Sequence, residues 1–174
     1  MHSRSTTVAA LAALLACFLT ASAQTAHSKA QPGPGLGKPA PVFARPALDG
    51  SRIDLAALRG KVVVLDFWAT WCAPCQVEMA TFREWQRQYG AQGLQVVGVS
   101  MDDDAATAQR LVKRLRVNYP VVMGDEKIGA QYGGVLGLPL VYILGCDGTV
   151  RARFQGETAP AKILEALRPL LAHP

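Results

Sequence analysis

Two cysteines separated by two residues are the strongest chemical signal in the sequence. Cys72 and Cys75 stand in the segment WCAPC, between the apolar run Val62–Trp68 and a helical pattern. A helix N-terminus lowers the pKa of a thiol and favours the nucleophilic thiolate, and a second thiol one turn later is able to resolve a mixed disulfide. We therefore expect dithiol–disulfide exchange, with Cys72 as the partly exposed attacking thiol and Cys75 as the buried resolving thiol.

The same pair of cysteines has two alternative interpretations. One is an inert structural disulfide, and the other is half of a zinc site, which needs about four ligands. The three histidines, His2, His27 and His173, all lie near the two ends of the chain. The ligand count therefore favours thiol chemistry, with no metal and no cofactor beyond the redox-active Cys72–Cys75 disulfide.

An aspartate interrupts the apolar run that leads to the cysteines. In a strand, Asp66 shares one face with Trp68 and Thr70, whereas Leu65 and Phe67 share the other face. A charged residue in a buried strand is costly, and burial raises the pKa of its carboxyl, which suits proton transfer near neutral pH. The alternative is a partly exposed aspartate that has a local partner.

Acidic residues near two predicted helix starts are able either to stabilise the helix N-terminus or to take part in the chemistry of a site. Glu78 follows Cys75 by one helical turn, so it either lies near the thiols or is a surface residue that favours the helix dipole. The aspartates at 102–104 precede a second helical pattern. We expect them to cap that helix rather than bind a metal, because adjacent carboxylates rarely converge on one ion.

The first residues have the pattern of an export signal. A weakly basic start is followed by an apolar stretch at 8–19 and by the segment ASA at 21–23, which fits a cleavage site. The stretch is shorter than the roughly 20 residues of a membrane span, so a retained anchor is the weaker alternative. A second alternative is lipidation of Cys17, which stands in the lipobox-like segment LLAC. Either route predicts a location outside the cytoplasm, in an oxidising compartment such as the bacterial periplasm.

The rest of the chain is organised as a linker and one domain. Residues 24–38 contain the segment PGPG and few apolar residues, which predicts a linker between the signal peptide (1–23) and the domain (39–174). The formal net charge is +5, but basic residues cluster only at 113–116, where the helical pattern indicates a solvated face. We therefore predict no nucleic-acid partner, and membrane contact only through the signal or a lipid anchor.

Strand and helix patterns alternate along the domain, which predicts an α/β sheet. Extended segments are expected at 42–48, 62–68, 94–99, 121–123, 140–144 and 150–154, a short segment begins at 53, and helices are expected at 74–89, 105–115, 127–132 and 160–171. The last two extended segments form a hairpin whose turn contains Cys146. With Cys17 removed the cysteine count is odd, so Cys146 is a free thiol or forms an intermolecular link, and a tolerated exposed cysteine is the simpler explanation.

These segments together resemble the thioredoxin superfamily, in particular its exported TlpA/ResA/CcmG-type branch. The resemblance covers residues 39–171 and is carried by GKVVVL at 60–65, FWATWC at 67–72, GLP at 137–139 and the Asp-Gly hairpin that follows. It implies a thioredoxin-like mixed sheet flanked by helices. It also implies an added N-terminal hairpin and an insertion after the second core strand, at 102–123.

The resemblance also implies roles for individual residues. Asp66 matches the buried aspartate that accepts the proton of the resolving thiol, although many members of the branch have asparagine there. Glu78 matches a glutamate that affects thiol acidity and partner recognition. Pro139 matches a cis-proline that presents the backbone of Leu138 to a substrate chain. The alternative for this proline is an ordinary trans residue at the start of a strand.

Two further residues of the WCAPC segment complete the predicted substrate site. Trp71 and Pro74 flank the cysteines, whereas Trp68 is either part of the site or part of the core. Leu140 stands where the family often has threonine, which leaves the substrate preference open. The Ala-Pro dipeptide between the cysteines resembles the Gly-Pro of thioredoxin more than the His-containing dipeptide of strong oxidants.

The sequence therefore predicts an exported thiol:disulfide oxidoreductase that reduces disulfides in periplasmic proteins. By resemblance, its electrons come from a membrane thiol-transfer protein, and its substrates belong to cytochrome c or copper-oxidase maturation. Three alternatives stay open: a disulfide-forming oxidant of DsbA type, a peroxiredoxin-like thiol peroxidase and a copper-binding assembly factor. Thr70 fits the peroxidase, but no arginine lies close in sequence, and the copper proteins use a distal histidine that the chain lacks between His27 and His173.

Overall fold

The apolar run before the cysteines forms the central strand of the sheet. Strand β3 (Val62–Trp68) is buried at each of its positions. It pairs in parallel with β4 (Leu94–Ser100) on one side and antiparallel with β6 (Leu140–Leu144) on the other. A strand that is covered on both faces needs apolar residues at successive positions, which explains why this run is continuous rather than alternating.

This computed structural model describes residues 33–172. The remaining strands are β1 (Ala44–Pro46), β2 (Arg52–Asp54), β5 (Val121–Met123) and β7 (Val150–Gln155), the helices are α1 (Ala73–Tyr89), α2 (Ala105–Arg114), α3 (Glu126–Gln131) and α4 (Pro160–Ala172), and short 3-10 turns span Ala56–Leu58 and Gly90–Gln92. The predicted signal peptide at 1–23 lies outside the described residues, as do Cys17, His27 and His173.

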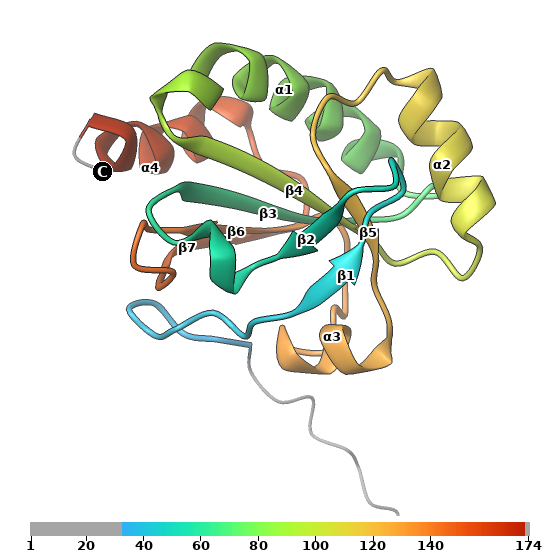
Figure 1. Cartoon of the computed structure of the whole chain (residues 1–174), viewed down its shortest axis with the longest axis horizontal. Coiled ribbons are helices and arrows are strands. Elements are labelled where there is room, and N and C mark those ends of the chain that lie inside the picture. The colour runs from blue at the N-terminus through green and yellow to red at the C-terminus, as the bar shows by residue number, and fades with distance from the viewer. Residues whose placement is uncertain (1–32, 173–174) are drawn as a thin grey trace, which may run out of the picture.

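The sheet is mixed, as predicted. Within the described residues its five strands lie in the order β5-β4-β3-β6-β7, and β1 and β2 form a separate two-stranded antiparallel sheet (Figure 1). The N-terminal hairpin is therefore confirmed. The predicted insertion at 102–123 is confirmed as well, because it forms α2 and the edge strand β5, which pairs in parallel with β4.

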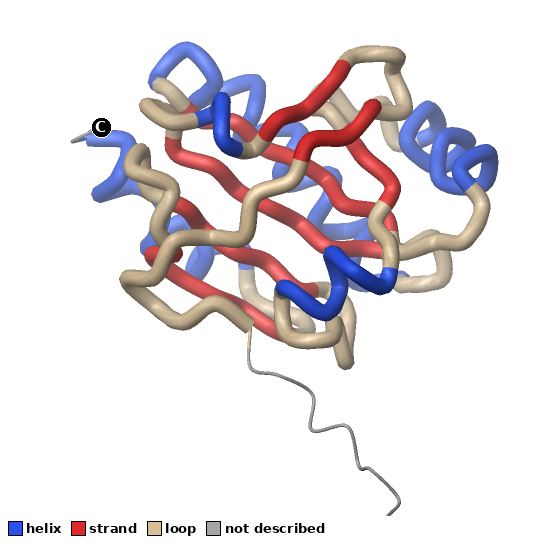
Figure 2. Tube along the Cα trace, turned by 60° about the horizontal axis from the view of Figure 1, so that its bottom comes forward, coloured by secondary structure: helices blue, strands red, loops and turns tan. Residues whose placement is uncertain are grey.

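Different elements cover the two faces of the sheet. On one face, side chains of β3 and β4 pack with α1, α2 and α4. On the other face they pack with β2, α3 and the segment at 40–47, which crosses the strands in Figure 2. We call these the α1 face and the α3 face. Because successive side chains of a strand point to opposite faces, Asp66 lies on the α1 face, and Leu65 and Phe67 lie on the α3 face.

Some element boundaries differ from the predicted ones. The extended segment expected at 42–48 forms a ladder only over Ala44–Pro46. Helix α3 begins one residue before the predicted start, because the carboxylate of Asp125 accepts a hydrogen bond from the Ile128 backbone N–H and caps the helix.

The end of the predicted linker lies against the domain. The backbone N–H of Gly37 donates to the carbonyl of Val150 at 2.8 Å, and the N–H of Val150 donates to the carbonyl of Lys38 at 2.9 Å. Residues 24–32 of the linker lie outside the described residues. None of the helices described between residues 33 and 172 combines the length and the apolar character that a membrane crossing requires.

Candidate active site

Cys72 and Cys75 form a disulfide at the start of α1, with their Cα atoms 5.3 Å apart. Cys72 is the N-cap of the helix, and its Sγ accepts a hydrogen bond from the backbone N–H of Cys75 at 3.3 Å. Pro74 stands in the first turn, where its missing N–H costs nothing. The predicted pairing and its position at a helix N-terminus are therefore confirmed, and the same N–H would stabilise a Cys72 thiolate.

The predicted exposure of the attacking thiol is wrong for the disulfide form. Cys72 is only 5% exposed, and Cys75 is fully buried. The reason is the N-cap geometry, since the side chain of Cys72 bends back over the first turn toward Cys75 and joins the α1-face core. Cys72 is still the more exposed residue of the two.

Asp66 is completely buried, and neither oxygen of its carboxylate has a hydrogen-bond partner among the described residues. The alternative of a partly exposed aspartate with a local partner is therefore wrong. Burial raises the pKa of the Asp66 carboxyl well above its ordinary value, and the nearby charge of Glu78 adds to the rise. The side chain lies on the same face of β3 as Trp68, as predicted, and this face also carries Cys75 in its core.

Glu78 is also buried, so the alternative of a surface glutamate that serves the helix dipole is wrong. Only 4% of the residue is exposed, and its two carboxylate oxygens have no hydrogen-bond partner in the described part of the chain. Burial raises the pKa of Glu78 to about 7, and the charge of Glu157 adds to the rise. Glu78 thus joins Asp66 as a second buried carboxyl, and its charge contributes to the raised pKa of Asp66.

A surface groove of about 390 Å³ opens beside Glu78. Its walls come from the start of α1 and from the segment before α4, and they consist of Pro74, Val77, Glu78, Glu157, Thr158, Ala159 and Pro160. Pro74 therefore lines a groove, and its role in substrate binding stays a prediction. Within residues 33–172 we find no group of three or more His, Cys, Asp or Glu side chains that is able to hold a metal ion.

The peptide bond between Leu138 and Pro139 is cis, so the predicted isomer is confirmed. Antiparallel pairing sets Leu140 opposite Phe67, which brings residues 138–139 to the edge of the sheet where β3 ends and the cysteine loop begins. Pro139 is buried and Leu138 is half-buried. Their roles in substrate binding stay predictions.

Exposed apolar side chains surround this edge of the sheet. Trp71, directly before the first cysteine, is 72% exposed, whereas Trp68 is completely buried and belongs to the core. Val77 and Leu136 are exposed to a similar degree and were not predicted. Val77 lies two residues after Cys75, and Leu136 lies three residues before Pro139. Their closeness in sequence to these two motifs could have identified them as candidates.

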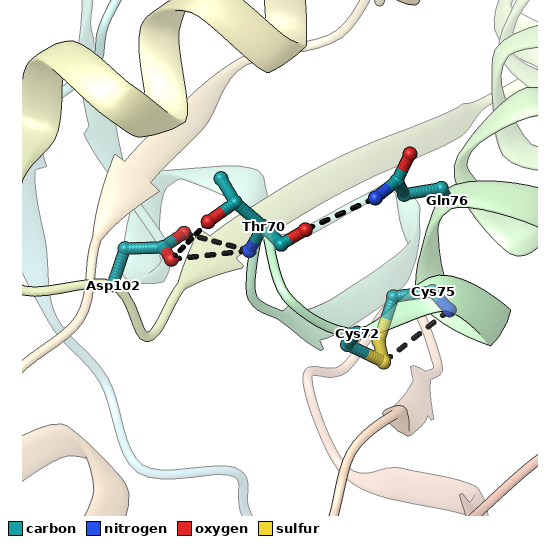
Figure 3. Close-up of a disulfide and its surroundings, with 5 residues drawn as sticks. All are labelled: Thr70, Cys72, Cys75, Gln76 and Asp102. Atoms are coloured by element: carbon teal, nitrogen blue, oxygen red, sulfur yellow. Dashed lines mark hydrogen bonds between the residues drawn. A yellow bond between two sulfur atoms is a disulfide. The ribbon is translucent and has the colours of Figure 1, made fainter.

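The three aspartates after β4 have different roles, and only one of them caps a helix. Asp104 accepts hydrogen bonds from two backbone N–H groups at the start of α2, as predicted. The carboxylate of Asp102 instead accepts hydrogen bonds from Thr70, in the loop that leads to the cysteines (Figure 3). The prediction that all three cap the helix is therefore wrong for Asp102, because the chain turns at the end of β4 and directs this side chain toward β3.

Cys146 lies in the turn between β6 and β7, half-buried and without a disulfide partner among the described residues. Its backbone carbonyl accepts a hydrogen bond from the Gly60 N–H at 2.9 Å, which joins this turn to the start of β3. It is therefore less exposed than predicted, because its side chain packs against the α1-face core.

Known proteins with similar sequences carry out thiol–disulfide chemistry. The chain matches the AhpC/TSA family over residues 36–153. It is 32% identical over 137 residues to thiol-disulfide oxidoreductase ResA of Bacillus thuringiensis subsp. konkukian, and the aligned region covers 78% of each chain. It is 33% identical over 141 residues to thiol:disulfide interchange protein DsbE of Escherichia coli, which covers 78% of this chain and 73% of that protein.

Solved structures agree with these relatives. A crystal structure from Chlorobium tepidum, assigned as a thiol:disulfide interchange protein DsbE, superposes with a TM-score of 0.73 at 29% identity and covers 80% of this chain and 99% of that chain. A secreted thiol-disulfide isomerase from Corynebacterium glutamicum superposes with a TM-score of 0.67 at 25% identity and covers 76% and 85%. The chain therefore belongs to the AhpC/TSA family, as a thioredoxin-like thiol-disulfide oxidoreductase of the ResA and DsbE type.

Proposed function

We propose that this protein is exported and that its Cys72–Cys75 dithiol reduces disulfides in other proteins outside the cytoplasm. The observation that carries the proposal is the placement of the two cysteines. Cys72 caps the start of α1, where a thiolate is stabilised, and a buried carboxyl, Asp66, lies on the core side of the same site. An attacking thiol and an acceptor for the second proton are thus available in one site.

The exchange balances as two successive substitutions at sulfur. The Cys72 thiolate attacks one sulfur of the substrate disulfide, forms a mixed disulfide and displaces a substrate thiolate. Cys75 then loses its proton to the Asp66 carboxylate and attacks Cys72, which releases the second substrate thiolate and leaves the Cys72–Cys75 disulfide. Two electrons pass to the substrate, so the protein must be reduced again before the next cycle.

Trp71, Pro74, Leu138 and Pro139 are proposed to receive the substrate chain. Their support is position, because the exposed indole of Trp71 precedes Cys72 and the cis-proline stands at the same edge of the sheet. The half-buried Leu138 would offer backbone groups to an extended segment, in the manner of strand addition. We expect the substrate to carry an apolar residue beside its cysteine, because that residue would pack against the exposed apolar side chains around this edge.

The proposed direction, compartment and partners rest on sequence. The Ala73-Pro74 dipeptide favours reduction, and resemblance to the TlpA/ResA/CcmG-type branch favours a membrane thiol-transfer protein as electron source and substrates of cytochrome c or copper-oxidase maturation. Export is supported by the pattern at 1–23 and by the secreted relative from Corynebacterium glutamicum. We propose the same domain division as before, with a signal peptide at 1–23, a linker at 24–38 and a domain at 39–174.

The three alternatives differ in their support. An oxidant of DsbA type would use the same cysteines and is separated from a reductant only by the reduction potential. A thiol peroxidase would use the hydroxyl of Thr70 beside the reactive sulfur, but this hydroxyl donates to the carboxylate of Asp102 at 2.7 Å. The copper alternative depends on a distal histidine, and His27 and His173 lie outside the described residues.

The test is the reduction potential of the Cys72–Cys75 couple. We would equilibrate the chain from residue 24, carrying Cys146→Ser, with dithiothreitol and glutathione buffers. A value near that of thioredoxin supports a reductant. A value about 150 mV higher, near that of DsbA, would reverse the electron flow and contradict the proposal. A separate assay of hydrogen peroxide consumption tests the peroxidase alternative.

A further inference from the structure

The loop that leads to the cysteines is held at a single residue by hydrogen bonds from two directions (Figure 3). The backbone N–H of Thr70 donates to the Asp102 carboxylate at 3.0 Å, and the Thr70 hydroxyl donates to it at 2.7 Å. On the other side, the side-chain amide of Gln76 in α1 donates to the Thr70 carbonyl at 3.0 Å. All three polar groups of Thr70 are therefore bonded, two residues before Cys72.

The sheet topology explains why Asp102 reaches this loop. In the parallel pair of β3 and β4, Trp68 lies opposite Ser100, so both strands end at the same edge. The backbone N–H of Met101 donates to the Trp68 carbonyl at 2.8 Å and extends the ladder by one bond. The Ser100 hydroxyl donates to the Asp102 carboxylate at 2.8 Å and orients it. The carboxylate thus accepts three different donors and is fixed toward Thr70.

We propose that Asp102 is a positioning residue, which holds Thr70 so that Cys72 stays at the N-cap of α1 when the disulfide is reduced. In the disulfide form the bond to Cys75 holds Cys72 in this place. In the dithiol form that bond is gone, and the loop between Trp68 and Cys72 keeps its course through the hydrogen bonds at Thr70. The proposal concerns the exchange reaction itself, so it holds whichever way the electrons flow.

The loss of Asp102 should change the pKa of the Cys72 thiol, and the sign of the change distinguishes a positioning role from an electrostatic one. If Asp102 acts by position, its loss lets Cys72 leave the N-cap, the thiolate loses the Cys75 N–H and the helix dipole, and the thiol pKa rises. If Asp102 acts only as a nearby negative charge, its removal favours the thiolate and the thiol pKa falls.

The experiment measures the pH dependence of Cys72 alkylation in the reduced full-length protein. Iodoacetamide is added over a pH series, and alkylation at Cys72 is quantified by fragmentation mass spectrometry, which distinguishes it from alkylation at Cys75 in the same peptide. For Asp102→Ala we expect the pKa of Cys72 to rise by about half a unit, with a roughly threefold lower alkylation rate below the pKa. Thr70→Val, which removes a hydroxyl but no charge, should shift it in the same direction by less.

Asp104→Ala is the matched control. It makes the same substitution two residues away and removes the α2 cap, which lowers the stability of the protein without touching Thr70. We expect it to leave the pKa of Cys72 unchanged. The proposal is overturned if Asp102→Ala lowers this pKa or leaves it unchanged, or if Asp104→Ala raises it as much, since the effect would then follow from general loss of stability.

Discussion

The two faces of the central sheet treat their buried polar groups in opposite ways. On the α3 face, two tyrosines lie deep in an aromatic core with Phe67, and both hydroxyls are bonded. The hydroxyl of Tyr132 donates to the Pro41 carbonyl at 2.6 Å, and that of Tyr142 donates to the Tyr132 carbonyl at 3.0 Å. These bonds join α3, β6 and the N-terminal segment, so the polar atoms of this face serve the fold.

On the α1 face, the buried Ser100 hydroxyl donates to Asp102, but other buried polar atoms lack such partners. The unsatisfied side-chain atoms among the described residues are the carboxylate oxygens of Asp66 and Glu78, the indole nitrogen of Trp68 and the hydroxyl of Tyr119. The indole nitrogen of Trp68 and the ring of Tyr119 both border the space above Gly98, which is the partner of Asp66 in the neighbouring strand. The missing side chain of Gly98 therefore leaves room for polar groups beside Asp66.

The contrast indicates where the molecule carries its chemistry. A fold selected for stability alone pairs its buried polar groups, as the α3 face does, because each unpaired group costs about 1–3 kcal/mol. The α1 face keeps two unpaired carboxyls, which is a cost without a structural return. Substitutions on the two faces should therefore change activity and stability in different combinations.

The largest expected effect is the loss of activity on replacing the attacking sulfur. Cys72→Ser should lower the rate of disulfide reduction by about 10³-fold or more, because an alcohol does not replace a thiolate as nucleophile. Turbidity of reduced insulin is a suitable measurement. Cys146→Ser, at the opposite end of β6, is the control and should keep full activity. Retained activity in Cys72→Ser would show that the wrong sulfur has been assigned.

The next effect concerns the sign of a stability change. Because burial raises the pKa of Asp66 in the folded state, the unfolded chain loses this proton at lower pH, and stability falls as pH rises above about 4. Asp66→Asn should abolish this fall, so the oxidised variant should be more stable than the parent at about pH 8, and the difference should be much smaller at about pH 5. Urea unfolding at several pH values measures the difference.

The control for Asp66 is a carboxylate with the opposite shift. Hydrogen bonds from Thr107 and Ala106 lower the pKa of Asp104, so its contribution to stability is present above the unfolded pKa and is lost on acidification. Asp104→Asn should therefore reduce the loss of stability that the parent shows on acidification. It should leave the loss of stability at high pH, which comes from Asp66, unchanged. A loss of stability in Asp66→Asn at about pH 8 would mean that the carboxylate is paired and that the two faces do not differ.

A smaller effect of the same sign is expected at Glu78. Its pKa is raised by burial from 4.5 to about 7, so the parent should lose stability between these two values as pH rises. The full shift corresponds to about 3 kcal/mol, but Glu78 lines an open groove where solvent screens its charge, so Glu78→Gln should remove this loss and gain about 2 kcal/mol above about pH 7, measured by urea unfolding of the oxidised protein. Glu84→Gln, on an exposed position of the same helix that contacts Arg87, should show no such gain.

The sequence was sufficient for features that depend on local pattern. The paired cysteines, the central strand and the order of strands and helices follow from spacing and from apolar periodicity. Asp66 is conspicuous for a local reason too, since it is the charged residue inside an apolar run. The N-terminal hairpin, the insertion at 102–123 and the cis bond at Pro139 were predicted only through resemblance, because no local pattern specifies them.

Features that depend on contacts between distant segments were missed. Asp102 could not be distinguished from its two acidic neighbours, because its role arises only when β3 and β4 end side by side. The burial of Glu78 depends on the segment at 157–160, which lies about half the chain away in sequence. The burial of Cys72 depends on how its side chain bends over the helix start, which the spacing of two cysteines does not specify.

The smallest effect tests the α3 face and completes the comparison. The hydroxyl of Tyr142 donates to the Tyr132 carbonyl and accepts a hydrogen bond from the Nε of Arg153 at 3.0 Å. Tyr142→Phe leaves that buried carbonyl without this partner, so unfolding free energy should fall by about 1 kcal/mol. The reduction potential and the pKa of Cys72 should stay unchanged. A shift in either would mean that the aromatic core also sets the thiol chemistry, and the division of labour between the two faces would have to be abandoned.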